Sequence, residues 1–189
     1  MAMMRRGGRR IAAIGALVAL VTAMLFVSGL TATSPDYRAV VDVSTRAMQA
    51  TQQVPTQAFV RSNGLVGQTN EQIIALAEAQ FRDLYTGSVL ARKLAIVDGA
   101  LGGQLTEGAT IDDAGMADVV VTSVTIDGNH ASVQASGTGW ATFTQQVAGH
   151  DPVTARPQNV TDWTFTLVKA GDKWLIESED WTFAPGSEP

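Results

Sequence analysis

Residues 163–176 read WTFTLVKAGDKWLI, and this stretch decides the fold class. Large apolar side chains alternate with polar ones on both sides of Gly171, which is the period of a strand with one buried face. A Gly-Asp turn accepts the positive φ that a tight hairpin requires. The stretch therefore predicts two antiparallel strands, the second of which continues toward Trp181 and Phe183.

A second hairpin is predicted upstream, with its turn at Asp127-Gly128-Asn129. A strand with a period of two precedes this turn, and a long return strand runs from about residue 130 to 147. Gly137 and Gly139 within the return strand predict a bulge or bend. Together the two hairpins give four antiparallel strands.

The first half of the chain has a helical period instead. Residues 34–36 (Ser-Pro-Asp) are typical of a helix start, and residues 69–72 match a capping box. A third helix begins near Ser88, and we expect it to end at the glycines between residues 99 and 103. Helices followed by antiparallel strands predict an α+β fold: helices packed on a curved four-stranded sheet, with a cone-like hollow at its open end.

The N-terminal region predicts a membrane anchor. Residues 11–30 read IAAIGALVALVTAMLFVSGL and carry no charge, and such a helix matches a hydrocarbon core of about 30 Å. Four arginines within residues 5–10 place the N-terminus in the cytoplasm. A cleaved signal peptide has the same basic start and remains the alternative, although its apolar run is typically about 7–15 residues. Either alternative delivers residues 31–189 across a membrane.

The predicted organisation has five parts: a cytoplasmic basic segment (1–10), a transmembrane anchor or signal peptide (11–30), a helical stalk and linker (31–68), an α+β domain (69–184) and a tail (185–189). The helix after residue 34 either continues from the membrane as a stalk or packs on the domain. Residues 31–189 hold 9 of the 13 basic residues and all 18 acidic ones, and the resulting charge of −9 argues against a nucleic-acid partner. The absence of cysteine excludes disulfides and thiolate metal sites.

Two segments carry a resemblance to a known family: Phe81-Arg82-Asp83-Leu84-Tyr85 on a capped helix, and the closing hairpin at 163–176. They resemble the nuclear transport factor 2-like superfamily, also called the ketosteroid isomerase-like or cystatin-like cone fold, over roughly residues 69–183. Such domains commonly end in a hairpin with a Gly/Asp turn followed by Trp-x-Ile. With an anchor in front, the chain is similar to actinobacterial Mce-associated envelope proteins and to periplasmic scaffold subunits of type IV secretion machines.

The resemblance implies a pocket in the cone, for which Tyr85, Asp98, Trp140 and Trp163 are the candidate lining residues. No catalytic motif of the superfamily carries over. An isomerase site of this type needs a buried carboxylate base opposite an oxyanion-stabilising Tyr and acid, but Tyr85 and Asp83 are two apart on a helix and lie on different faces. We expect Tyr85 to be a core residue with a hydrogen-bonded hydroxyl.

The sequence predicts no metal and no cofactor. His130 and His150 lack ligand spacing, and the chain contains no nucleophile elbow, phosphate loop or dinucleotide fingerprint. The acidic clusters are interpreted as solvated edge or loop charges: Asp112-Asp113, and Glu177, Glu179 and Asp180.

The function predicted from these observations is that of a non-catalytic single-pass envelope protein. Its extracytoplasmic cone domain would mediate protein–protein interaction or assembly, with an envelope protein or a further copy as partner. The alternative is a small-ligand-binding or ketosteroid isomerase-like enzyme domain, membrane-anchored or secreted. The enzyme requires a carboxylate with a raised pKa, buried against aromatic side chains in an open pocket.

Overall fold

The computed structural model describes residues 34–54, 56–106, 109–146 and 149–188. The predicted basic segment at 1–10 and the predicted anchor at 11–30 lie outside these residues. Within the described ranges, no helix combines the length and the apolar character needed to cross a membrane.

Four helices lie in the described part of the chain: α2 (Pro35–Gln53), α3 (Gln57–Ser62), α4 (Asn70–Arg82) and α5 (Gly87–Thr106). The predicted helix starts are confirmed, because Ser34 accepts a hydrogen bond from the Tyr37 amide and the capping box at 69–72 is formed. Helix α3 was not predicted. Its signal was Thr56, which caps the helix by accepting from the Phe59 amide.

The expected end of α5 is wrong, because the helix continues through Gly99, Gly102 and Gly103 to Thr106. A glycine within a helix costs about 1 kcal/mol relative to alanine and does not by itself terminate it. No neighbouring atom lies within 4 Å of the position a Cβ would take at Gly99. Close packing therefore does not explain the glycine there.

The sheet is antiparallel, with the order β1-β2-β4-β5 and a short β3 paired to β2. Its strands are β1 (Ala109–Asp127), β2 (His130–Gln145), β3 (Val153–Ala155), β4 (Gln158–Ala170) and β5 (Lys173–Phe183). Both predicted turns are confirmed, with Gly128 at φ +56° and Gly171 at φ +67°. Among the described residues the count of four strands is corrected to five, since β3 forms in the expected polar loop by pairing with Phe143–Gln145.

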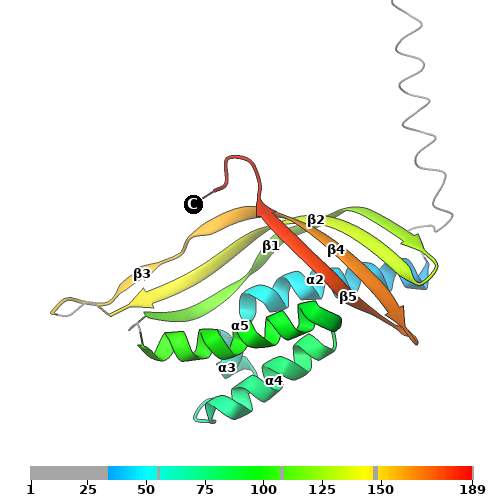
Figure 1. The fold of residues 1–189 in the computed structure, drawn as a ribbon. Helices are drawn as coiled ribbons and strands as arrows, with labels where there is room; N and C mark the ends of the chain where they lie inside the picture. The colour runs from blue at the N-terminus through cyan, green and yellow to red at the C-terminus, as the bar shows by residue number, and fades with distance from the viewer. Residues whose placement is uncertain (1–33, 55, 107–108, 147–148, 189) are drawn as a thin grey trace, which may run out of the picture.

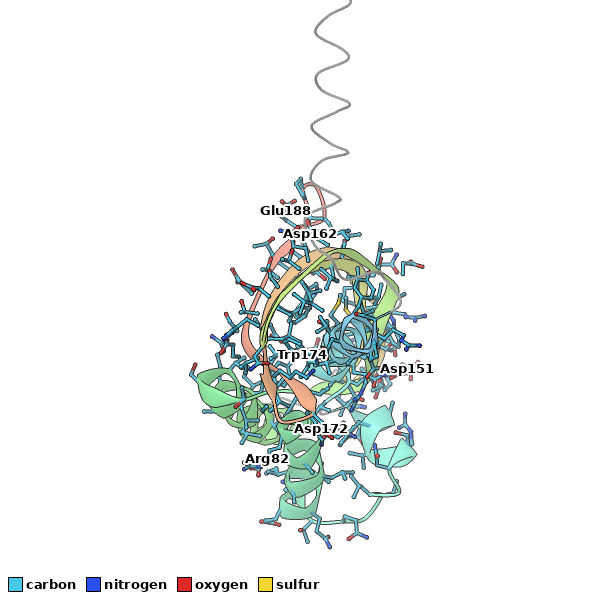
Figure 2. The ribbon with its side chains drawn as sticks, turned by 90° about the vertical axis from the view of Figure 1, so that its right-hand side faces the viewer. Arg82, Asp151, Asp162, Asp172, Trp174 and Glu188 are labelled. Atoms are coloured by element: carbon cyan, nitrogen blue, oxygen red, sulfur yellow. The ribbon has the colours of Figure 1, made fainter. Side chains whose placement is uncertain are left out.

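All four helices lie on one face of the sheet, and the sheet curves around α2 (Figures 1 and 2). Helix α2 and the strands supply fully buried residues to one core: Val40, Ala47, Met48, Val133, Phe165 and Leu167. Helix α2 therefore packs on the domain, which was the second alternative for this segment. Figure 2 shows Trp174 on the inner side of the sheet and Asp162 on its outer side.

The bulge expected at the glycines of β2 lies on the facing strand. The register of β1 shifts between Ala117 and Val120, and Asp118 takes a φ of +52°. A Cβ at Gly137 would lie 2.8 Å from the Cε of Met116 and 3.2 Å from the Cε of Met48. The glycine thus makes room for two methionines, while the bulge in β1 bends the sheet around them.

Helix α2 also closes part of the β1 edge through the side chain of Gln49. Its Nε2 donates to the Met116 carbonyl at 2.8 Å, and the Met116 amide donates to its Oε1 at 3.1 Å. One amide side chain therefore satisfies both backbone groups of an edge residue, as a neighbouring strand would.

We predict that Gln49→Ala lowers the free energy of unfolding by about 1–3 kcal/mol, because two backbone groups at a half-buried edge lose their partners. For a chain of this length the melting temperature falls by about 2–4 °C per kcal/mol. Thermal unfolding of the full chain, followed by tryptophan fluorescence, measures the shift. The control is Gln53→Ala, an exposed glutamine of the same helix; equal shifts for the two variants would contradict the assignment.

Asp36 connects the start of α2 to the closing hairpin. Its Oδ1 accepts from the Lys169 Nζ at 2.6 Å and from the Trp174 Nε1 at 2.9 Å. The hydrogen bond from Lys169, and after it the one from Trp174, lowers the pKa of Asp36 below its ordinary value.

A carboxyl with a lowered pKa stabilises the folded state above its unfolded pKa of about 3.9, and this contribution is lost as the pH falls through the folded value. We therefore predict that the melting temperature of Asp36→Asn is less sensitive to pH below about 4 than that of the unmodified chain. Melting curves between neutral and acidic pH test this. If the melting temperatures of the two proteins fell by the same amount as the pH is lowered, the prediction would be wrong.

Candidate functional site

A one-residue bulge in β5 determines which side chains of this strand face the helices. Leu167 pairs with Ile176, but Thr166 pairs with Ser178, so that Glu177 is left without a partner in the ladder. Before the bulge the even-numbered Ile176 faces inward, whereas after it the inward positions are odd-numbered. Glu179 therefore points into the interior.

Glu179 is held there by a closed ring of four side chains. The Lys93 Nζ donates to the Glu179 Oε1 at 2.5 Å and to the Thr51 Oγ1 at 2.8 Å. The Tyr85 hydroxyl donates to the Glu179 Oε2 at 2.6 Å and lies 3.1 Å from the Thr51 Oγ1. Because the single Tyr85 proton goes to Glu179, Thr51 donates to Tyr85 and the ring closes. It joins α2, the α4–α5 connection, α5 and β5.

The ring is buried and internally neutral. The side chains of Lys93 and Glu179 are only 6% and 5% exposed. Burial lowers the pKa of Lys93, and the Glu179 carboxylate partly opposes this shift. Burial, and after it the charge of Glu179, raises the pKa of Tyr85 well above its ordinary value, so its hydroxyl stays protonated. No buried side-chain polar atom in the described residues lacks a hydrogen-bond partner.

The interpretation of Glu179 as a solvated charge is wrong, because the bulge and Lys93 bring it into the core. Glu177 and Asp180 are exposed, as expected. Within the described ranges, no group of three or more His, Asp or Glu side chains is placed to hold a metal ion. His130 lies 3.8 Å from the Glu177 carboxylate at the surface.

An aromatic pocket of about 300 Å³ opens near the C-terminal end of α2. Trp181 and Phe143, which are 45% and 36% exposed, form part of its wall. Trp181 stacks on the buried Trp163 at 6.0 Å and meets Phe183 edge-on at 5.4 Å. The lining residues with described placement are Gln52, Gly139, Trp140, Ala141, Phe143, Pro157, Asn159, Thr161, Trp181 and Phe183. We call this hollow the aromatic pocket.

A larger hollow of about 620 Å³ lies between α2 and α4. Arg46 and Asp83 line it and pair with one another at 3.2 Å, and Lys173 also pairs with Asp83 at 2.8 Å. These side chains are about half exposed or more, so the ion pairs in this surface groove contribute little to stability.

The four candidate lining residues fall in different places. Trp140 lines the aromatic pocket. The guanidinium of Arg156 stands 4.3 Å from the Trp140 ring, and these two residues together line a separate hollow. Trp163 is buried behind the pocket wall, and Tyr85 belongs to the ring. The side chain of Asp98 lies outside the described residues.

Sequence reasoning missed most of the side chains that form the ring and the aromatic pocket. Lys93 had a readable signal, since it stands on the face of α5 that also carries Leu90, Leu94 and Val97, and a lysine on an apolar face requires a buried partner. Glu179 had none, because its orientation depends on the bulge in β5.

Comparison with known proteins finds similar chains among solved structures. No protein-family model matches the sequence, and no curated protein matches it. Among solved structures, the chain is similar to the intermembrane-space region of the chloroplast protein ARC6, with 18% identity, 66% of this chain and 97% of that chain covered, and a TM-score of 0.40. It is also similar to an NTF2-like protein with a cystatin-like fold from Novosphingobium aromaticivorans, with 12% identity, 96% and 94% covered, and a TM-score of 0.40.

Likenesses of this size carry no conclusion about the family, activity, ligand or partner of this chain. The membrane anchor and the Mce-type association stay predictions.

We predict that Lys93→Met lowers the free energy of unfolding by about 3–5 kcal/mol, because it leaves a buried carboxylate without its cation. The double variant Lys93→Met/Glu179→Leu is expected to recover most of this loss, since an apolar pair often replaces a buried ion pair without cost. In the double variant the Tyr85 hydroxyl keeps Thr51 and the Ala47 carbonyl as neighbours.

Thermal unfolding of the full chain provides the measurement. Arg92→Met, at the exposed neighbour of Lys93, is the matched control and should change the free energy of unfolding by less than about 0.5 kcal/mol. If Lys93→Met behaved like Arg92→Met, the ion pair would not contribute as described.

Proposed function

We propose that this chain is a non-catalytic, single-pass envelope protein whose extracytoplasmic domain binds a partner protein through the aromatic pocket. The observation that carries the proposal is the pocket wall itself, where Trp181 and Phe143 stay 45% and 36% exposed. Exposed aromatic side chains gathered around a hollow are typical of protein-binding sites, where they fill or receive anchor residues.

The state of the ring argues against acid–base chemistry at Glu179. Both carboxylate oxygens are engaged, one by the Lys93 ammonium and one by the Tyr85 hydroxyl. A general base must reach the proton that it removes, and Glu179 faces its own partners in the core. The Tyr85 proton is likewise committed to Glu179 and does not point at a ligand.

The charge of the exported part indicates the chemistry of the partner. Residues 31–189 carry a net charge of −9, which favours approach by a basic surface and disfavours an acidic one. The pocket itself is aromatic. We therefore propose a partner that presents an apolar side chain flanked by lysine or arginine.

The membrane part of the proposal rests on the sequence of residues 5–30, with four arginines followed by twenty uncharged positions. Helix α2 begins at Pro35, five residues after the end of that segment. The anchor would therefore hold the domain close to the membrane surface.

Site-specific photo-crosslinking in intact cells tests the proposal. A photoreactive phenylalanine analogue at Phe143, in the full chain, should give a discrete protein adduct. The matched control is the same analogue at Val66, which is 69% exposed in the α3–α4 connection and is not a lining residue of the pocket; it should give none. The same cells are also fractionated, and the N-terminus of the chain is identified by mass spectrometry. We expect the chain to be in the membrane fraction with its N-terminus uncleaved.

Two outcomes would contradict the proposal. Equal adducts at Phe143 and Val66 would show that the pocket is not a specific surface. A chain shortened to a start near residue 33 and released from the membrane would remove the anchor and favour the secreted alternative.

The pocket volume of about 300 Å³ also favours a second candidate, since it reaches the lower end of the range for small-molecule sites. A small ligand would give no protein adduct at Phe143. It would instead appear as a bound organic molecule when the purified full chain is analysed by native mass spectrometry.

A further inference from the structure

The wall of the aromatic pocket has two possible registers. In the observed one, the bulge at Glu177 directs Glu179, Trp181 and Phe183 inward. A regular continuation from Ile176 would instead direct Ser178, Asp180 and Thr182 inward, because side chains alternate strictly along an unbulged strand. The two registers therefore exchange an aromatic wall for a polar one.

The bulge lies between two fixed points. On one side, the Ile176 amide donates to the Leu84 carbonyl at 2.8 Å, and the Thr86 amide donates to the Ile176 carbonyl at 2.9 Å. On the other side, Glu179 is held by Lys93 and Tyr85. Tyr85 takes part at both points, through its backbone bridge to Ile176 and through its hydroxyl.

The pocket wall continues directly from this second point. Trp181 follows Glu179 on the same face of β5, opposite Trp163 on β4, and Phe183 comes next, opposite Thr161. Whatever fixes Glu179 therefore fixes the two aromatic side chains beyond it.

We infer that Lys93 and Glu179 are positioning residues for the aromatic pocket: their buried contact selects the bulged register and thereby turns Trp181 and Phe183 into the pocket. This inference rests on the proposed function of the pocket as a docking site. Without Lys93, the chain relieves the unpaired Glu179 carboxylate by adopting the regular register, which moves Glu179 to the solvent and both aromatic side chains with it.

The stacked pair Trp163–Trp181 provides a signature that does not depend on any partner. Two indoles 6.0 Å apart at 28° couple their electronic transitions, and the coupling appears as a paired band in far-ultraviolet circular dichroism. Trp181→Phe removes the band and thus assigns it. Lys93→Met, measured below its melting temperature, should lose the band, whereas Lys93→Met/Glu179→Leu should keep it because leucine remains inside.

Deletion of Glu177 is the decisive companion variant. It makes the ladder regular while leaving Glu179, Trp181 and Phe183 on the inner face, since Ser178 then follows Ile176 directly. The deletion variant should keep the paired band. The band should also survive when Lys93→Met is added to the deletion, because no alternative register with a polar inner face is then available without a new bulge.

The inference is overturned if Lys93→Met keeps the band in the chain that retains Glu177. This result would mean that burial of the aromatic side chains alone sets the register. It is also overturned if deletion of Glu177 abolishes the band. Should Lys93→Met fail to fold, Lys93→Gln, which also removes the cation but keeps a hydrogen-bond donor, is measured in its place: loss of the band supports the inference and retention overturns it.

The same variants separate this inference from the proposed function. The adduct formed by the photoreactive analogue at Phe143 should be lost when Lys93→Met is added and retained when Glu177 is deleted. If the circular dichroism band changes as expected among the variants but neither they nor the chain with Lys93 and Glu177 intact gives an adduct, the docking function fails and the positioning role stands. If the adduct and the band both persist in Lys93→Met, the docking function stands and the positioning role fails.

Discussion

The buried contact between Lys93 and Glu179 is the constraint on which the interior of this domain depends. A carboxylate taken out of water must be paired and hydrogen-bonded, or it costs several kcal/mol. Glu179 meets this requirement with Lys93 and Tyr85, and Thr51 closes the ring. Since the partners come from α2, α5 and the connection before α5, one charged residue of the last strand fixes the helical layer against the sheet.

The general architecture could be predicted because it follows from local signals. The change from a helical to a strand period predicts the α+β class, and the turns at Gly128 and Gly171 predict both hairpins. The departures have local causes as well. Helix α3 is too short for a periodicity to show, and β3 forms only because β2 offers it an edge.

The candidate site was far less predictable, because its key feature is a register. Along β5, alternation from Trp174 and Ile176 predicts that Glu179 and Trp181 face solvent, and one unpaired residue reverses this. A bulge of this type leaves little trace in a single sequence. Lys93 was the one readable sign, since an unpaired cation on an apolar helix face is costly, and it implied a buried acid that the sequence alone did not identify.

The ring and the aromatic pocket differ in what they offer to a binding molecule. In the described part of the chain, every buried side-chain nitrogen or oxygen atom has a hydrogen-bond partner. Binding at the pocket would then use aromatic surface that is already exposed at Trp181 and Phe143, without breaking any buried hydrogen bond. A preorganised wall of this type favours recognition of a partner, because the cost of ordering its side chains is met during folding. Catalysis at Glu179 would instead require the ring to open, and with it the contact that joins β5 to the helices.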